Sequence, residues 1–177
     1  MKKLKKPKNV KLVVAFFSNQ PGILARTEKF LSKKFGRIDY RSNDLDFTET
    51  DYYNEEMGNG LKMRFVSFER LVKRSSLPQI KLLSIKLEKK FSLKNGNLEK
   101  RKVNIDPGLL SMENFILATH KPYSHRIYLK KGIWADLTLI FSKTGFSNLP
   151  WTYPNYRSEN VKKILYQIRN LYHKQIF

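Results

Sequence analysis

Residues 10–17 constrain the fold most, because a short apolar run there is followed at once by a change of periodicity. The run is rich in β-branched residues and ends at the turn-forming sequence Ser18-Asn19-Gln20-Pro21. A run of this length and composition is typical of a buried β-strand. Apolar residues then recur at helical spacing from Ile23 to Phe35, and Gly36 provides the stop. The chain is therefore expected to begin with a strand followed directly by a helix.

The patterns up to residue 105 predict the order strand, helix, strand, strand, helix, strand. After the first helix the expected segments are a strand over 37–40 with 45–48 as its extension, a loop over 54–60 and a strand over 61–68. A helix starting near Pro78 and ending at Asn95-Gly96 and a strand over 101–105 follow. Asp106-Pro107-Gly108 is expected to be a turn, since all three residue types favour turns. This order fits a split βαβ, ferredoxin-like half.

The last third of the chain predicts an antiparallel meander and a covering helix. Strands are expected over 115–119, 125–129 and 133–141, with Lys130-Lys131-Gly132 as a three-residue hairpin loop. Ser158 is placed to cap a C-terminal helix that carries its own apolar stripe. The predicted fold class is α+β: the ferredoxin-like half, extended by the meander, with the C-terminal helix covering the sheet.

The predicted hairpin brings two pairs of side chains together. If residues 129 and 133 flank the loop, Tyr128 lies opposite Trp134 and Arg126 lies opposite Asp136. One interpretation is structural, an aromatic pair and an ion pair that hold the hairpin together. The other is that this face forms the floor of a pocket, with aromatic rings for stacking and Arg126 as an anion fork. In the second case Asn104 and Asp106 would join the face, and residues 151–154 would form its rim.

The length and composition of the chain predict one domain. We expect a basic N-terminal tail over residues 1–9 and a single α+β domain over 10–177. The tail carries five lysines, but the apolar run behind it is too short for a signal peptide, and no stretch is long enough to span a membrane. A cytoplasmic location is expected. The chain contains no cysteine, which excludes disulfides, thiolate metal sites and a cysteine nucleophile.

Charge is strongly segregated along the chain. The net charge is +20, yet residues 37–69 carry four basic and eight acidic side chains, and the segments 1–36 and 70–105 carry +9 each. One interpretation is a carboxylate cluster that binds Mg²⁺ or moves a proton, inside a basic surround that binds an anionic substrate. The other is that the acidic segment simply neutralises neighbouring basic helices. The spacing matches no known metal loop.

Several motifs with a known mechanism are missing. The chain has no Gly-x-x-x-x-Gly-Lys-Ser/Thr loop, no Gly-x-Gly-x-x-Gly, no His-Glu-x-x-His and no Gly-x-Ser-x-Gly. Its three histidines are His120, His125 and His173. A three-histidine zinc site would need all of them, so it is disfavoured. His120 or His125 could serve as a general base, although both are also expected in an exposed loop.

Four short motifs together resemble one known family. They are Thr50-Asp51-Tyr52-Tyr53 with Glu56-Met57-Gly58, Val103-Asn104-Ile105-Asp106-Pro107-Gly108, Leu117-Ala118-Thr119 with Lys121 and His125-Arg126-Ile127-Tyr128-Leu129, and Trp151-Thr152-Tyr153-Pro154. Essentially the whole chain resembles the uncharacterised family known as domain of unknown function 4416. The resemblance implies positions to inspect and assigns them no roles.

Three functions remain open. The favoured one is a binding or catalytic domain for a phosphorylated small molecule or nucleotide, with Mg²⁺ as a possible cofactor. In it Asp51, Glu56 and Asp106 hold Mg²⁺ or move a proton. The predicted substrate-binding residues are Tyr52, Tyr53, Arg64, Asn104, Lys121, Arg126, Tyr128, Trp134 and Tyr153. The alternatives are an RNA-binding module, suggested by the net charge and the aromatic content, and a structural partner-binding protein without an enclosed pocket.

Overall fold

The computed structural model of this chain describes residues 3–48, 53–95 and 98–177. Strand β1 (Lys11–Ser18) is buried along its whole length and lies inside an antiparallel sheet, which confirms the predicted buried strand. It pairs with β4 (Lys62–Phe68) on one side and with β7 (Asn104–Leu110) on the other. Two further strands, β2 (Ile38–Arg41) and the short β3 (Leu45–Asp46), both pair with β4.

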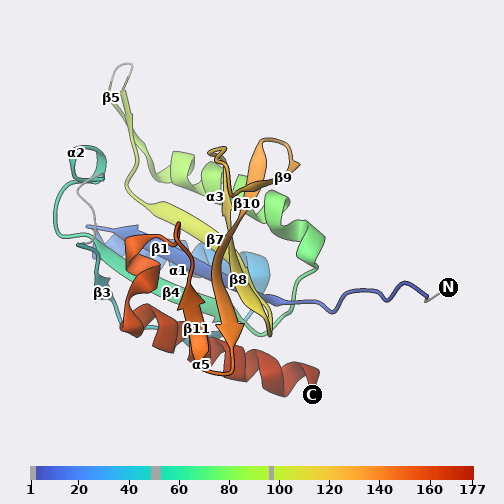
Figure 1. Cartoon of the computed structure of the whole chain (residues 1–177). Coiled ribbons are helices and arrows are strands. Elements are labelled where there is room, and N and C mark those ends of the chain that lie inside the picture. The colour runs from blue at the N-terminus through green and yellow to red at the C-terminus, as the bar shows by residue number, and fades with distance from the viewer. Residues whose placement is uncertain (1–2, 49–52, 96–97) are drawn as a thin grey trace.

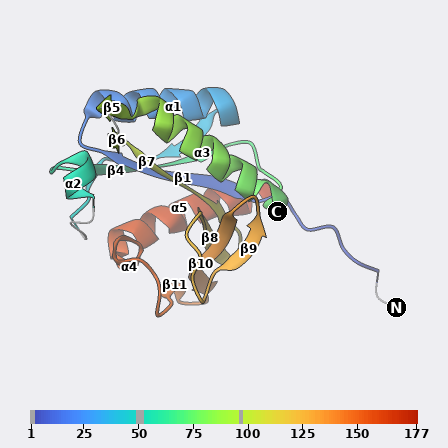
Figure 2. The same ribbon diagram turned by 90° about the horizontal axis from the view of Figure 1, so that it is seen from above.

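Two helices cover one face of this sheet (Figures 1 and 2). Helix α1 (Pro21–Phe35) and helix α3 (Leu77–Phe91) begin with Pro in their first turn, as helix starts favour. A short 3-10 turn, η1 (Arg74–Ser76), leads into α3. The apolar stripes of both helices pack on side chains of β1 and β4, and none of these core residues is more than 8% exposed.

The meander extends the sheet beyond β7. Its strands are β8 (Asn114–Thr119), β9 (Ile127–Lys130), β10 (Ile133–Ser142) and β11 (Gly145–Asn148), and the order across the described sheet is β11-β10-β8-β7-β1-β4-β2, with β9 on β10. The hairpin loop is one residue shorter than expected. Lys130 already pairs with Ile133, and the two loop residues Lys131 and Gly132 have φ of 54° and 74°. Both are positive, as a two-residue type I′ turn requires.

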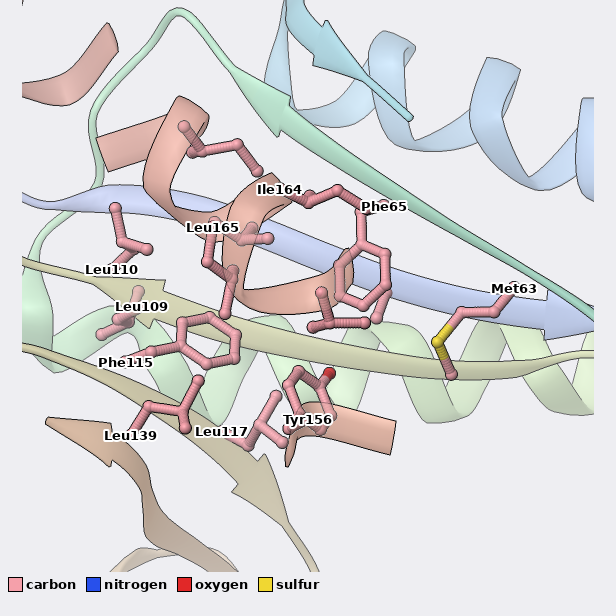
Figure 3. Close-up of a cluster of buried hydrophobic side chains, with 14 of the residues drawn as sticks. Met63, Phe65, Leu109, Leu110, Phe115, Leu117, Leu139, Tyr156, Ile164 and Leu165 are labelled. Atoms are coloured by element: carbon pink, nitrogen blue, oxygen red, sulfur yellow. The ribbon is translucent and has the colours of Figure 1, made fainter. Parts of the chain in front are cut away.

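The C-terminal helix covers the opposite face of the sheet, as predicted. Helix α5 (Glu159–Ile176) follows a single turn, α4 (Pro154–Arg157), and the Ser158 hydroxyl accepts the amide N–H of Val161 as its cap. Figure 3 shows the core under this helix, where Leu165 belongs to the same cluster of buried side chains as Phe65 of β4 and Phe115 of β8. The sheet therefore has two cores, one on each face.

The expected turn at Asp106-Pro107-Gly108 is wrong, because all three residues lie inside β7. The backbone N–H of Ile105 points away from β1 and donates to Glu88, so by alternation the nitrogen of Pro107 also points away from β1. Proline therefore removes no hydrogen bond from the β1–β7 ladder. Gly108 is needed for another reason: a Cβ there would lie 2.6 Å from the Phe115 ring.

Smaller differences concern the segments around α3. The expected loop over 54–60 contains one helical turn, α2 (Asn54–Met57). Helix α3 ends at Phe91 rather than at Asn95-Gly96, and a small separate hairpin of β5 (Leu93–Asn95) and β6 (Leu98–Lys100) follows. The α+β class, the antiparallel sheet and the covering C-terminal helix are confirmed, and the ferredoxin-like detail stays a prediction. Within the described residues, no helix is long and apolar enough to cross a bilayer.

Candidate functional site

A cavity of about 570 Å³ opens where the sheet divides between β7 and β8. These two strands pair only from Gly108 to Leu110, opposite Leu117 to Phe115. Beyond that point β8 stays with β10, through Ala118 and Thr119, while β7 stays with β1. The residues that line the gap are Phe17, Phe47, Tyr53, Met63, Lys81, Glu88, Arg101, Asn104, Asp106, Leu117, Ala118, Thr119, His120, Lys121, Asp136, Tyr153, Pro154, Asn155 and Tyr156.

Helix α3 satisfies the backbone of β7 where β8 has left it. The Nζ of Lys81 donates to the carbonyl of Ile105 at 2.9 Å, and the Oε1 of Glu88 accepts the amide of the same residue at 2.6 Å. Both side chains are buried, with Lys81 4% and Glu88 6% exposed. An unpaired buried peptide group would cost roughly 1–3 kcal/mol, so these two contacts allow the gap to persist without a third strand.

A chain of charged and amide groups runs along one wall of the cavity. Arg101 holds Glu56 with two guanidinium nitrogens, each 2.6 Å from a carboxylate oxygen, and its third nitrogen donates to Asn104 at 2.9 Å. Asn104 donates to Asp106 at 2.6 Å, and Asp106 accepts from Lys81 at 3.0 Å. The Arg101 fork lowers the pKa of the Glu56 carboxyl. This wall is therefore a fixed row of hydrogen-bonded polar groups.

Burial shifts the pKa values of two groups at this cavity, Glu88 and His120, in opposite directions. Burial raises the pKa of Glu88 to about 7, against the opposing effect of the neighbouring Lys81 ammonium. Burial, reinforced by the positive charges of Lys81 and Lys121, lowers the pKa of His120. The Glu88 carboxyl thus changes its charge near neutral pH, and the neutral form of His120 is favoured. The cavity contains one group ready to exchange a proton near neutral pH.

A second cluster, built on the hairpin, borders the cavity. Asp136 on β10 is 1% exposed in its side chain and accepts from Arg126 at 2.9 Å and from His125 at 3.1 Å. Arg126 also donates to the hydroxyl of Tyr153 and, at 2.9 Å, to the carbonyl of Lys121. The predicted Arg126–Asp136 pair is confirmed. Through Tyr153 it ties the hairpin to α4 and so shapes the rim of the cavity.

The apolar wall is aromatic and contains one unsatisfied hydroxyl. Phe17 and Phe47 stack at 4.4 Å between ring centroids, and Tyr53 meets Phe17 edge-on at 4.8 Å. Tyr156 packs between Phe65 and Phe115 and is only 3% exposed. Its hydroxyl is buried and has no hydrogen-bond partner among the described residues. Burial raises the Tyr156 pKa well above its usual value, so this hydroxyl remains a hydrogen-bond donor.

The structure gathers about half of the predicted site residues at this cavity. Tyr53, Asn104, Asp106, Lys121 and Tyr153 line it. Arg126 reaches it through Tyr153, and Glu56 through Arg101. Asp51 and Tyr52 lie outside the described residues.

Three predicted residues lie elsewhere. Arg64 is bound to Asp44 and Glu28 near α1, at 2.6 Å from each. Tyr128 and Trp134 form the predicted aromatic pair on the hairpin, with ring centroids 5.2 Å apart, and neither lines the cavity. Their placement favours the structural interpretation of the hairpin face for this pair.

The acidic segment is largely paired with cations. Asp39 binds Lys11, Asp44 binds Arg64, and Asp46 binds Lys62. Glu56 is held by Arg101. In the part of the chain that the structure describes, no three acidic or histidine side chains gather in a way that could hold a metal ion. These carboxylates pair with cations of β1, of β4 and of the segment before β7 rather than with the expected basic helices, and the Mg²⁺ hypothesis stays a prediction.

Most residues that line the cavity were not among the predicted site residues, and four of these are central to its chemistry: Lys81, Glu88, Arg101 and Tyr156. Lys81 and Glu88 lie within the predicted second helix, for which the sequence predicts no site residue. Arg101 is at the start of the strand predicted over 101–105, whereas β7 begins only at Asn104. Tyr156 follows the recognised Trp-Thr-Tyr-Pro motif by two positions. The sequence does contain a signal for Lys81 and Glu88, because residues seven positions apart lie on the same side of a helix and both are at the edge of its apolar stripe.

Comparison with known proteins gives a family and no closer relative. A search of curated proteins found no match, and a search of solved structures found none either. A family model described as a domain of unknown function, DUF4416, matches residues 8–172. This match confirms the resemblance seen in the four motifs and covers nearly the whole chain, so the protein belongs to the DUF4416 family.

Proposed function

We propose that the cavity binds a small anionic ligand of about the size of a nucleotide. A phosphate or carboxylate oxygen of this ligand accepts a hydrogen bond from the Tyr156 hydroxyl. The observation that carries this proposal is the buried Tyr156 hydroxyl, which has no partner in the described chain and belongs to a residue that lines the cavity. Buried polar groups nearly always have a partner, and leaving one without costs roughly 1–3 kcal/mol.

The missing partner must be a hydrogen-bond acceptor. The raised pKa of Tyr156 keeps its hydroxyl protonated, so the group can donate. Lys81 adds a second donor on the polar wall, because its ammonium has three hydrogens and its described bonds are to Ile105 and Asp106. A phosphate or carboxylate oxygen accepts from both kinds of donor. A bound water would also satisfy the hydroxyl, and the experiment below separates the two.

Size and lining suit a ligand with a flat part. A volume of about 570 Å³ falls within the range of small-molecule sites, roughly 300–1,000 Å³. The rings of Phe17, Phe47 and Tyr53 offer an apolar surface on which a base or another planar group can stack. The net charge of +20 favours the approach of an anion from solution.

Among the three functions open at the sequence level, the cavity favours the first over the partner-binding protein, which was expected to lack an enclosed pocket. No Mg²⁺ is included in the proposal, since Glu56 and Asp106 are already paired with Arg101 and Lys81. The proposal is one of binding, and Glu88 is a titratable side chain that lines the cavity.

Calorimetric titration of the full chain tests the proposal. The probes are adenosine 5′-triphosphate, adenosine 5′-monophosphate and inorganic phosphate, with uncharged adenosine as the control ligand. We expect at least one phosphorylated probe to bind, adenosine to bind more weakly, and Tyr156→Phe to weaken the bound probe roughly 10- to 100-fold, as for a hydrogen bond to a charged group.

The matched control is Tyr166→Phe, which removes a hydroxyl from a tyrosine that is 46% exposed on α5. It should leave the affinity unchanged. Two results would overturn the proposal: no probe binds at millimolar concentration, or Tyr156→Phe binds as tightly as the unaltered chain. The second result is the one expected if the hydroxyl contacts only water.

A further inference from the structure

The outer surface of the α1–α3 layer carries an unusual excess of positive charge. This layer covers the face of the sheet opposite to α5 (Figure 2). Seven basic side chains of the two helices are exposed: Arg26, Lys29, Lys33 and Lys34 of α1, and Lys86, Lys89 and Lys90 of α3. We refer to these seven residues as the basic face.

No acidic side chain of these helices neutralises the basic face. Glu28 of α1 is bound to Arg41 at 2.9 Å and to Arg64 at 2.6 Å. Glu88 of α3 is buried and bound to the Ile105 amide. In the described chain no carboxylate lies within 4.0 Å of a charged nitrogen of the seven residues, whereas most carboxylates of the acidic segment are paired. The excess charge is therefore left open to solvent.

The cations of the two helices lie close to each other where α1 begins and α3 ends. Arg26, Lys29 and Lys33 recur at helical spacing and so line one stripe of α1. On α3, Lys86 and Lys90 are one turn apart. The guanidinium of Arg26 lies 4.9 Å from the centre of the Phe91 ring at the end of α3, which brings the two stripes side by side.

The chemistry of this surface selects its partner. None of the exposed large apolar side chains of the described chain lies in α1 or α3. Without aromatic rings the basic face has no platform for unstacked bases, which single-strand binding uses. Without apolar side chains it also lacks the wedge that inserts into a lipid surface. Cations alone suit the regular phosphate rows of a duplex.

We infer that the basic face binds the phosphate backbone of double-stranded nucleic acid without regard to sequence. This interaction is separate from the cavity, which is lined by none of the seven residues. It also sharpens the RNA-binding alternative, because it places the contact on two helices and assigns it to phosphates rather than to bases.

The test is a salt series with fluorescently labelled 24-base-pair duplexes of two unrelated sequences. The test variant is Lys29→Gln, Lys33→Gln and Lys89→Gln combined. The control variant is Lys143→Gln, Lys163→Gln and Lys174→Gln combined, which removes the same charge from exposed lysines outside α1 and α3. Circular dichroism and melting of each variant check that both still fold.

For the unaltered chain we expect a Kd of about 1–10 µM in low salt, equal for the two sequences, with log Kobs falling linearly against log salt. The test variant should lower the slope by about 2–3 and weaken binding at least 10-fold at moderate salt, since each phosphate contact contributes about 0.9 to the slope. The control variant should stay within about 3-fold, and Tyr156→Phe should have no effect.

Three results would overturn the inference. The duplexes fail to bind in low salt, or the test and control variants weaken binding equally, which would show a response to net charge alone. The third is that vesicles containing phosphatidylserine bind in a manner that depends on the basic face while the duplexes do not. Since the cavity variant is measured in the same assay, failure here leaves the proposed ligand site untouched.

Discussion

Lys81 and Glu88 lie seven positions apart on α3 and bind the carbonyl and the amide of one residue, Ile105, at 2.9 and 2.6 Å. In an antiparallel sheet these two groups would pair with the next strand, but β8 has already separated from β7 at this point. The helix supplies the partners that the strand does not. The division of the sheet, and with it the cavity, therefore depends on two side chains of a neighbouring helix.

The Glu88 contact predicts a specific dependence of stability on pH. Because burial raises the Glu88 pKa from 4.5 to about 7 in the folded chain, the folded state binds more protons than the unfolded state between these values. The free energy of unfolding is then highest, for this group, below pH 4.5 and falls as pH rises through 7. The difference is roughly 3 kcal/mol for a shift of this size.

Glu88→Gln isolates this effect, since the amide oxygen of glutamine can still accept the Ile105 N–H. Urea unfolding at pH 5 and pH 8 should show a larger loss of stability for the unaltered chain than for the variant, which should be the more stable of the two at pH 8. Equal pH dependence of the two proteins would show that Glu88 titrates at its ordinary pKa.

Gly108 predicts a second measurable effect, on packing between β7 and β8. A Cβ at this position would lie 2.6 Å from the Phe115 ring and 2.9 Å from the carbonyl oxygen of Ile116. Gly108→Ala should therefore lower the free energy of unfolding by about 1–3 kcal/mol, as overpacking does. Gly22→Ala is the control, because nothing lies within 4 Å of its added methyl group, and it should be neutral or slightly stabilising. Thermal melting of both variants tests this prediction, with a lower melting temperature expected for Gly108→Ala than for Gly22→Ala. Equal melting temperatures would contradict the predicted clash.

The sequence predicted those elements in which local periodicity and long-range packing agree. The apolar run of β1 and the stripes of α1 and α5 follow from local periodicity alone. The hairpin pairs Tyr128–Trp134 and Arg126–Asp136 were also predicted, although the loop is shorter than expected, because a register shift between Ile133 and Trp134 restores the predicted pairing. The turn expected at residues 106–108 is wrong because these residues continue β7, where the nitrogen of Pro107 points away from β1 and Gly108 leaves room for the Phe115 ring. Neither feature can be recognised from the local sequence. β11 was missed, since a four-residue strand after a tight turn leaves little periodic signal.

The site was harder to predict than the fold. Its motif residues Tyr53, Asn104, Asp106, Lys121 and Tyr153 do meet at the cavity. The residues that hold the cavity open come from α3, however, and their roles arise only where a helix crosses a divided sheet. The place of Lys81 and Glu88 at the edge of the apolar stripe indicates that they could be buried, but nothing in the sequence shows that both would bind the backbone of β7.

We predict that breaking the buried Asp136–Arg126 ion pair lowers the free energy of unfolding more than breaking an exposed one. Its side chain is 1% exposed and neutralises Arg126, which is 9% exposed. Asp136→Ala leaves that guanidinium buried without a counter-charge and should cost about 3 kcal/mol of unfolding free energy. The control is Asp46→Ala, which removes the exposed partner of Lys62 and should cost under about 1 kcal/mol. Chemical unfolding of both variants gives the comparison, and similar losses would contradict the role given to Asp136.

Tyr156 predicts opposite effects on stability and on binding. Without ligand, Tyr156→Phe removes a buried hydroxyl that has no partner and should raise the unfolding free energy by about 1 kcal/mol, provided that the ring stays packed against Phe65 and Phe115. Differential scanning calorimetry of the ligand-free proteins checks the direction. A clear loss of stability would mean that the hydroxyl has a partner within the folded chain or an ordered water.

The most direct measurement of the ligand site is a map of backbone amide shifts during titration with adenosine 5′-triphosphate. Binding in the cavity predicts that the largest amide shifts fall on β7 from Asn104 to Gly108 (except Pro107, which has no amide hydrogen), on His120 just after β8 and on α4 around Tyr156. Tyr156→Phe should reduce these shifts. Shifts confined to the basic face of α1 and α3, or no shifts at millimolar concentration, would contradict the account.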